Sequence, residues 1–387
     1  MVIGVSDIME AHNEENTENA PEDSASNEVE SEDLSLGESI QKPFSPSDIN
    51  IQTPPMNMGD LIDMIENGWI NFGTEYQRAP DLWKSAQQSR LIESVLLGLR
   101  LPAFYFEAVE KRKWNIIDGQ QRCCAINNFC VKQSLALEHL EFLKDAFNGK
   151  KYGDLPFEVK RDIRMLPITV NVLEKGTPAD VKYILFKRLN TGGIELKPQE
   201  IRNAVFSGIA IDTVAEMAKD EAFLKATCYK IPTLRKEDMD FVSRFIAFYV
   251  NDYTSYEPDL ESFINEGMKK IKTGNIDLSK MKADFHKSME LAYRIFGDRA
   301  FRKQISKEEK RKPLNKAVFE VFAVIFSRLN DYDAGKLISK REALNFELWS
   351  ALKNSLTFRN SFSGGTGLKN SVITRFETTK KIINSIL

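Results

Sequence analysis

The sequence of 387 residues contains only four cysteines and three histidines. No two cysteines form a C-x-x-C pair, so neither a zinc site nor a disulfide framework is indicated, and reduced thiols are expected. The scarcity of histidine disfavours a histidine-rich metal site and nucleases that need paired histidines. No apolar run reaches the roughly 18 residues of a membrane span, and the N-terminus does not resemble a secretory signal. The sequence therefore predicts a cytoplasmic protein without a membrane partner.

Basic residues are absent from the first 41 positions, which hold twelve of the 56 acidic residues. The net charge of −3 therefore hides a remainder with 53 Lys and Arg against 44 Asp and Glu, a net charge of +9. A Glu/Asn/Ser-rich composition with few aromatics cannot form a core, so residues 1–45 are predicted to be a disordered acidic tail. The charge asymmetry suggests a hypothesis in which this tail binds the basic body and blocks a nucleic-acid site.

Hydrophobic periodicity divides the rest of the chain into two parts. Residues 46–208 mix helical and strand-like patterns, which predicts an α/β domain, and residues 209–387 show helical periodicity throughout. In the first part we expect helices over 57–67, 88–97, 123–131, 178–189 and 198–207, and strands over 103–109, 113–117 and 167–173.

A motif of five residues, Asp118-Gly119-Gln120-Gln121-Arg122, lies between an expected strand and an expected helix. Backbone N–H groups at a helix N-terminus attract phosphate, and glycine lets the backbone approach a ligand. Arg122 can hold two phosphate oxygens, and Asp118 can hold a divalent cation or orient a water. The alternative is an Asp N-cap, a turn glycine and a surface arginine, which the spacing alone favours.

Two loops supply further candidates. Tyr76-Gln77-Arg78 lies between two expected helices, and an arginine with aromatic neighbours can bind phosphate or a base. A solvated or packing role is the alternative. Residues 186–193 end a helix with a polar turn, which also fits an ordinary C-cap. Glu200 and Arg202 are two positions apart on a helix, so we expect them to contact different partners.

Several short motifs occur in one order along the chain. They are Tyr76-Gln77-Arg78 with Trp83, Leu91-Ile92-Glu93-Ser94, Leu101-Pro102, Ile117 with residues 118–122, Phe186 with Arg188-Leu189-Asn190-Thr191-Gly192-Gly193, and Glu200 with Arg202-Asn203. Each motif alone is weak, but the ordered set is specific. From about Ile51 to the C-terminus, the sequence resembles the N-terminal domain of GmrSD-type restriction systems, known as domain of unknown function 262.

The resemblance implies an α+β fold, with a ParB/sulfiredoxin-like α/β domain followed by a mostly α-helical domain. Residues 119–122 resemble the G-x-x-R phosphate-contacting box of that superfamily. Family members are associated with defence against phage and modified DNA, and in several the motif is linked to nucleotide hydrolysis that controls a nuclease. The resemblance therefore assigns catalysis to Asp118, Gln121 and Arg122, with Asp118 also as the metal ligand and NTP with Mg²⁺ as the cofactor. The expected nucleotide or phosphate contacts are Gln77, Arg78, Gly119, Gln120, Arg122, Arg188 and Asn190.

The sequence departs from the family pattern in two places. Cys123-Cys124-Ala125 follows the motif where relatives usually have Leu-Thr-Thr, and both cysteines follow Arg122, whereas the catalytic cysteine of sulfiredoxin precedes its arginine. We therefore expect these thiols to pack rather than to act in redox chemistry. His286 is the only histidine in the C-terminal half. We therefore expect this chain to lack the His-Asn-His-type nuclease domain that many relatives carry.

A basic stretch over residues 299–316 is a candidate contact for nucleic-acid phosphates. An ordinary solvated surface is the alternative. The candidate nucleic-acid-binding residues are Arg302, Lys303, Lys310, Arg311 and Lys312.

The sequence thus predicts a nucleotide-binding, NTP-hydrolysing regulatory component of a DNA restriction or phage-defence system. Its expected partners are a nucleotide, DNA and a separate nuclease or methyltransferase subunit. Two alternatives stay open. One is a non-catalytic DNA-binding or scaffold protein in which the motif binds a nucleotide or holds the fold. The other is a metal-dependent DNA nuclease that acts through the ParB-like domain.

Overall fold

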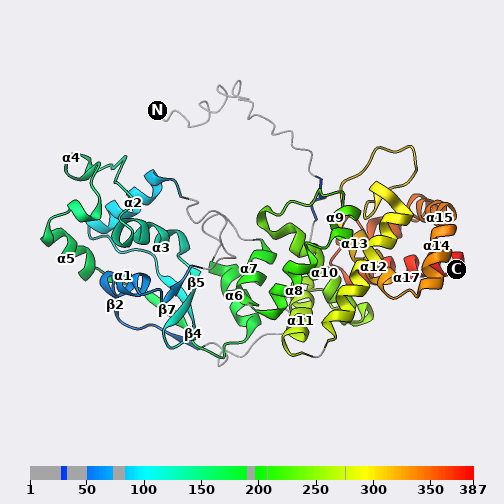
Figure 1. Cartoon of the computed structure of the whole chain (residues 1–387), viewed down its shortest axis with the longest axis horizontal. Coiled ribbons are helices and arrows are strands. Elements are labelled where there is room, and N and C mark those ends of the chain that lie inside the picture. The colour runs from blue at the N-terminus through cyan, green and yellow to red at the C-terminus, as the bar shows by residue number, and fades with distance from the viewer. Residues whose placement is uncertain (1–27, 33–49, 73–82, 190–196, 207, 275) are drawn as a thin grey trace, which may run out of the picture.

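The computed structural model describes residues 28–32, 50–72, 83–189, 197–206, 208–274 and 276–387. Figure 1 shows two lobes, a small α/β lobe and a larger all-helical lobe, with helices α6 and α7 at their junction. The small sheet and the mostly helical remainder confirm the predicted α+β class. In the part of the chain described, no helix is long and apolar enough to cross a membrane.

A mixed sheet forms the centre of the α/β lobe, with the strand order β1-β7-β4-β5-β3. The central strands β4 and β5 are antiparallel, while β7 runs parallel to β4, and β3 runs parallel to β5. A separate antiparallel pair joins β2 and β6. The strands are β1 (Ile51–Gln52), β2 (Met56–Asn57), β3 (Ile70–Asn71), β4 (Phe104–Glu110), β5 (Lys113–Asp118), β6 (Pro167–Ile168) and β7 (Val170–Leu173).

Three helices of this lobe lie near the expected ranges, and two further helices, over Lys144–Phe147 and Phe157–Met165, were not predicted. The first helix begins with a capping box, in which Asn57 and Asp60 accept each other's backbone N–H at 2.9 Å. It ends before Gly68, which has a φ of 67°. The α-helices are α1 (Met58–Glu66), α2 (Ser85–Leu96), α3 (Gln120–Ile126), α4 (Lys144–Phe147) and α5 (Phe157–Met165), and α3 continues as a π-helical turn over Asn127–Val131.

The helical lobe is built around a large aromatic core. Phe245 and Phe285 have ring centroids 4.8 Å apart, and Phe241 and Phe319 are 5.0 Å apart. Its helices are α6 (Ala179–Leu189), α7 (Pro198–Val205), α8 (Ile209–Met217), α9 (Glu221–Ala226), α10 (Glu237–Val250), α11 (Leu260–Lys272), α12 (Leu278–Phe296), α13 (Lys316–Ser327), α14 (Asp331–Ser339), α15 (Arg341–Asn354), α16 (Leu356–Asn360) and α17 (Lys369–Ile386).

The core of the helical lobe includes residues that precede the predicted boundary at residue 208, among them Ile117 of β5 and Leu173 of β7. Tyr183 and Phe186 of α6 and Ile201 of α7 are buried in the core of the helical lobe. The core of the α/β lobe reaches only to Val172. Helices α6 and α7 therefore belong to the helical lobe by packing, although they follow the sheet directly in sequence.

Residues 28–32 lie inside the segment predicted to be disordered, yet they contact the helical lobe. Val29 forms a parallel β-bridge with Leu314. The N–H of Glu30 donates to the carbonyl of Leu314 at 2.8 Å, and the N–H of Leu314 donates to the carbonyl of Glu28 at 2.7 Å. The prediction of disorder is wrong for these five residues, because partners far away in the sequence hold them and local composition does not show such partners.

Candidate functional site

The motif at residues 118–122 forms the predicted transition from strand to helix. Strand β5 ends at Asp118, Gly119 takes a φ of 99°, and α3 begins at Gln120. The N–H of Cys123 donates to the carbonyl of Gly119 at 2.8 Å, which closes the first helical turn. The turn therefore places the carboxylate of Asp118 and the side chain of Arg122 next to each other.

Gly119 is required here by both its backbone conformation and its surroundings. A φ of 99° is strained for residues with a side chain. A Cβ at this position would also lie 2.7 Å from Cδ1 of Phe104 and 3.3 Å from Nη2 of Arg122. The glycine thus lets the aromatic ring and the guanidinium group pack directly against the turn.

Arg122 is fixed in one position by several contacts. Its Nη2 donates to Oδ2 of Asp118 at 2.7 Å, and both terminal nitrogens donate to the carbonyl of Ala103 at 3.3 Å. Nη1 also donates to the carbonyl of Pro102. The guanidinium carbon lies 4.6 Å from the ring centroid of Phe104. The side chain is only 12% exposed, whereas that of Asp118 is 30% exposed.

The two glutamines of the motif bind the chain on either side of residues 73–82. Nε2 of Gln120 donates to the carbonyl of Phe72 at 3.4 Å. Oε1 of Gln121 accepts the N–H of Trp83 at 3.2 Å. Phe72 and Trp83 directly precede and follow the segment that contains Gln77 and Arg78. The glutamines therefore connect the motif to both ends of that segment.

The remaining predicted nucleotide contacts are placed only in part. Gln77, Arg78 and Asn190 lie outside the described residues. Arg188 is exposed in the last turn of α6, a helix that packs against β5. The structure therefore brings together Asp118, Gly119 and Arg122 and leaves the rest of the expected pocket as a prediction.

The motif offers one carboxylate to a metal ion. Among the described residues, no group of three or more His, Cys, Asp or Glu side chains could hold a metal by itself. Mg²⁺ in nucleotide sites is commonly bound by one or two carboxylates together with substrate phosphates and waters. Asp118 therefore fits Mg²⁺ that arrives with an NTP.

The cysteines after the motif are packing residues, as the sequence predicts. Cys123 and Cys124 are free thiols and are buried. Burial raises the pKa of Cys123 far above its ordinary value, and the nearby Arg122 lowers it only in part. A thiol that stays protonated is a poor nucleophile.

Glu200 and Arg202 contact different partners, as predicted from their spacing. Glu200 pairs with Arg235 at 3.1 Å. Arg202 has no exposed surface and pairs with Asp240 at 2.6 Å and with Glu261. Both residues thereby tie α7 to the helical lobe, which is a structural role.

The predicted nucleic-acid contacts occupy different environments. The side chain of Arg302 has no exposed surface, and it donates to the carbonyls of Asp298 and Lys312. This position differs from the prediction, because a buried guanidinium group cannot contact nucleic acid. Lys303 and Arg311 face Glu30 and Glu28, respectively.

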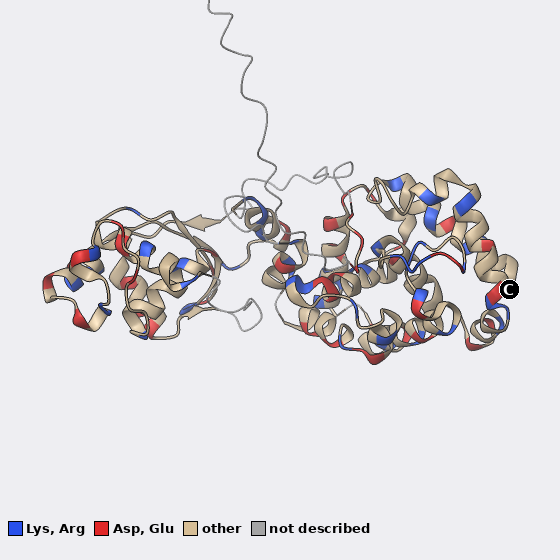
Figure 2. Ribbon diagram, turned by 90° about the horizontal axis from the view of Figure 1, so that it is seen from above, with Lys and Arg blue, Asp and Glu red and all other residues tan. Residues whose placement is uncertain are grey.

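The other two candidates lie in the same loop. Lys312 pairs with Glu309 at 2.7 Å, and Lys310 is exposed. Figure 2 shows Lys and Arg positions interspersed with Asp and Glu positions on both lobes. The net charge of +9 outside the acidic tail is therefore distributed among many acidic neighbours.

The comparison with known families identifies the class of this domain. Residues 58–207 match the family described as GmrSD restriction endonuclease, N-terminal domain. The match covers 150 of the 387 residues, and the matched range contains the whole 118–122 motif. No curated protein matches the chain. No solved structure matches it either, so the likeness to a ParB/sulfiredoxin fold stays a prediction.

Sequence reasoning missed the residues that support Arg122. Phe104 lies beneath the guanidinium group, and Pro102 and Ala103 accept its hydrogen bonds. Phe104 showed only the apolar pattern of a strand, which does not distinguish a ring that supports a site from one that fills a core. The carbonyl groups gave no sequence signal at all.

Proposed function

We propose that the chain is a nucleotide-binding, NTP-hydrolysing regulatory component of a restriction system of the phage-defence type. The GmrSD N-terminal domain indicates a restriction-system component. The nucleotide activity rests on one observation, the contact between Asp118 and a fixed Arg122 at the end of β5. DNA and a separate nuclease or methyltransferase subunit are the partners that this role requires.

The geometry supports an anion site that exists before the ligand binds. Two backbone carbonyls and the ring of Phe104 fix Arg122, so little side-chain entropy is lost when an anion arrives. The Oδ2 atom of Asp118, 2.7 Å from Nη2, occupies a position that a phosphate oxygen would take. In the proposed complex Arg122 binds phosphate.

The carboxylate released from this pair then has a second task. Asp118 holds the Mg²⁺ that accompanies the NTP or orients a water for attack on the γ-phosphorus. Attack breaks the bond between the γ-phosphorus and the bridging oxygen, and the products are inorganic phosphate and a nucleoside diphosphate. Gln121 follows Asp118 by three residues and joins it in the proposed catalytic set.

Phosphate release from ATP, GTP, CTP and UTP tests the proposal, with Mg²⁺ and with or without DNA. We expect release from at least one NTP and a loss of about 10²-fold or more in Asp118→Asn. Arg122→Lys keeps the charge but loses the fork, so it should also be impaired. The control is Asp162→Asn, because Asp162 is an exposed carboxylate of the same lobe. Equal release from wild type, Asp118→Asn and Arg122→Lys would remove the assignment.

One observation favours a second candidate function. The carbonyl contacts of Arg122 also join the start of α3 to the segment before β4, so the motif can simply hold the fold of a DNA-binding or scaffold protein. Under this alternative a nucleotide raises the melting temperature without turnover, or does not bind. The nuclease alternative predicts metal-dependent plasmid cleavage that depends on Asp118.

A further inference from the structure

The helical lobe holds residues 28–32 in a groove that plays no part in the nucleotide proposal. We call it the 28–32 groove and define it by six residues that contact the segment. They are Arg244, Lys303, Arg311, Leu314, Asn315 and Thr366.

The backbone of the segment is recognised in the manner of an added strand. Val29 and Leu314 form a parallel bridge, with two N–H···O hydrogen bonds of 2.7 and 2.8 Å. Leu314 also bridges Arg302 on its other side in antiparallel orientation. The side chain of Val29 packs against the core of the helical lobe. Main-chain pairing of this kind supplies affinity for a peptide, and the side chains supply specificity.

Three glutamates at alternate positions meet separate partners in the groove. Glu28 lies 3.6 Å from Nη2 of Arg311. One oxygen of Glu30 lies 2.5 Å from Nζ of Lys303, and the other accepts from Nδ2 of Asn315 at 3.0 Å. The groove therefore binds a carboxylate at every second residue and also pairs with the backbone between them.

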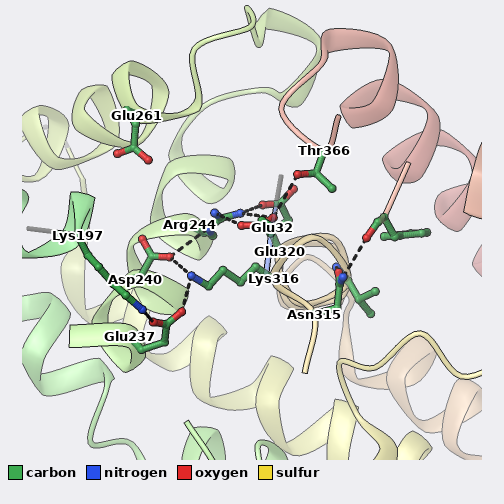
Figure 3. Close-up of polar contacts among 12 residues, drawn as sticks. Glu32, Lys197, Glu237, Asp240, Arg244, Glu261, Asn315, Lys316, Glu320 and Thr366 are labelled. Carbon is green, nitrogen blue, oxygen red and sulfur yellow. Dashed lines mark hydrogen bonds and ion pairs between the residues drawn. The ribbon is translucent and has the colours of Figure 1, made fainter. Parts of the chain in front are cut away.

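Glu32 has the most enclosed position of the three. Its oxygens accept from Nη1 and Nη2 of Arg244 at 3.1 and 2.5 Å, a bidentate arrangement, and Oγ1 of Thr366 donates to it at 3.3 Å. The side chains of Glu32 and Arg244 are only 7% and 3% exposed. Figure 3 shows Arg244 between Glu32 and Asp240, with Glu320 close by. Burial alone would lower the pKa of Arg244, but Glu32, Asp240 and Glu320 raise it.

Glu32 is part of a network of ion pairs in the helical lobe. The ion pairs around Arg244 join five cations to five carboxylates among the described residues. Only one of the carboxylates, Glu32, comes from outside the lobe. Without Glu32, the buried Arg244 would keep only Asp240 and Glu320, which it shares with Arg202, Lys316 and Arg375, and an incompletely paired buried cation is costly.

We propose that the 28–32 groove is a binding site for an extended acidic peptide, and that the chain's own residues 28–32 occupy it exchangeably. A partner protein that presents glutamates at alternate positions on an extended segment would bind by displacing them. The groove favours a peptide over nucleic acid because a sugar-phosphate backbone has no N–H and C=O groups to pair with Leu314. Nucleic acid also has no aliphatic branch to replace Val29.

A labelled peptide with the sequence of residues 25–36 tests the proposal by fluorescence anisotropy with the full chain. Wild type should bind it weakly, because the tethered segment competes at an effective concentration in the millimolar range. A chain with Glu28→Gln, Glu30→Gln and Glu32→Gln should bind it at least about 10-fold more tightly. A peptide with glutamine at the same three positions should bind neither chain.

Three further chains keep the test decisive. A matched control with Glu216→Gln, Glu266→Gln and Glu347→Gln removes the same charge from exposed positions and should behave as wild type. A chain with only Glu28→Gln and Glu30→Gln keeps the buried Glu32 and should show a gain of about 3-fold, even if the triple variant fails to fold. Adding Lys303→Ala to the triple variant should lower its affinity for the peptide.

Two results would overturn the proposal. One is equal affinity of the peptide for wild type, the folded groove variants and the matched control. The other is a groove variant that gains affinity for duplex DNA but not for the peptide, which would make residues 28–32 a nucleic-acid mimic instead.

Discussion

The two lobes enclose their arginines to different degrees. In the α/β lobe, Arg122 pairs with Asp118, a carboxylate that is 30% exposed. In the helical lobe, Arg202 and Arg244 are almost fully buried, and each contacts two or more carboxylates that are themselves at least 86% buried. An exposed partner can be exchanged for a ligand, whereas the buried carboxylates that the helices themselves supply fix the packing of those helices. Glu32 comes from outside the helices and is the exchangeable member of the network in our proposal. The same pairing chemistry therefore supports a candidate site in one lobe and a structural core in the other.

The comparison also bears on how much of the positive charge of the body a nucleic acid can reach. Several cations of the helical lobe form ion pairs with carboxylates inside the lobe, and Lys316 is an example. Its ammonium group lies 2.6 Å from Glu237 and 2.8 Å from Asp240. Burial would lower the pKa of Lys316, but Asp240 and the other nearby carboxylates raise it. Net charge thus overstates the charge that a nucleic acid can reach.

The largest effect is expected where the buried network is broken. Arg244→Met leaves Glu32 without its buried cationic partner and Glu320 with Arg375 alone, and it should lower the free energy of unfolding by about 3–5 kcal/mol. Urea unfolding of the full chain, followed by circular dichroism, measures this loss. Arg161→Gln, which removes an exposed ion pair of the α/β lobe, should change it by less than about 0.5 kcal/mol.

A double-mutant cycle gives the control for this first prediction. Adding Glu32→Leu to Arg244→Met removes both charges and should recover part of the loss. Strict additivity of the two substitutions would contradict a coupled buried pair.

A smaller effect is expected at the turn of the candidate site. Gly119→Ala combines a positive φ with a contact of 2.7 Å to Phe104. Gly68→Ala in the same lobe has a φ of 67° but no atom within 4 Å. We expect Gly68→Ala to cost about 1 kcal/mol and Gly119→Ala to cost about 1–3 kcal/mol more. Thermal unfolding compares the two, and equal losses would show that the ring and the turn are not in close contact.

In the α/β lobe, the buried carboxylate of Glu93 is held by backbone N–H groups. Burial raises its pKa, but the N–H groups of Glu141, Phe142 and Leu143 donate to it at 2.7–3.0 Å, and together with Arg90 they lower the pKa. Glu93→Gln should cost about 1–3 kcal/mol, because one amide cannot accept all three bonds.

The pH dependence distinguishes Glu93 from a simple packing residue. Since its folded pKa is lowered, its contribution is present above the unfolded pKa of about 4.3 and is lost as the pH falls through the folded pKa. The difference between wild type and Glu93→Gln should therefore shrink on acidification. A difference that stays constant from pH 7 to about pH 3 would contradict this account.

The smallest effect is expected at an exposed pair of the helical lobe. Nδ1 of His286 lies 2.8 Å from Asp220, and this hydrogen bond raises the pKa of His286 above 6.5. Its stabilising contribution is present below the unfolded pKa and is lost as the pH rises through the folded pKa. His286→Gln should therefore lower the melting temperature slightly at about pH 5.5 and leave it unchanged at about pH 9. The opposite pH trend would contradict the pairing.

Sequence pattern predicted the elements around the site because local signals determine them. The helix α1 and the strands β4 and β5 lie within one residue of the expected ranges, since apolar spacing and glycine stops fix their ends. The packing of α6 and α7 in the helical lobe was not predictable in the same way. Periodicity shows that a helix has a buried face, but not which core that face joins.

Long-range contacts limited the rest of the prediction. Residues 28–32 have the composition of a disordered tail, and only pairing with Arg244, 212 positions away, places Glu32 inside the protein. Arg302 shows the same limit, because a basic stretch in the sequence does not reveal which of its side chains is buried. The turn at Asp118 was visible in the sequence, but the support of Arg122 by carbonyl groups was not.

The central claim is that Asp118 and Arg122 bind and hydrolyse a nucleotide. Its most direct test is the rate of phosphate release from a saturating NTP with Mg²⁺, measured for wild type, Asp118→Asn and Asp162→Asn at equal folded fraction. The account predicts turnover by wild type and Asp162→Asn, and a loss of about 10²-fold or more in Asp118→Asn. Release at the same rate from all three proteins would contradict it.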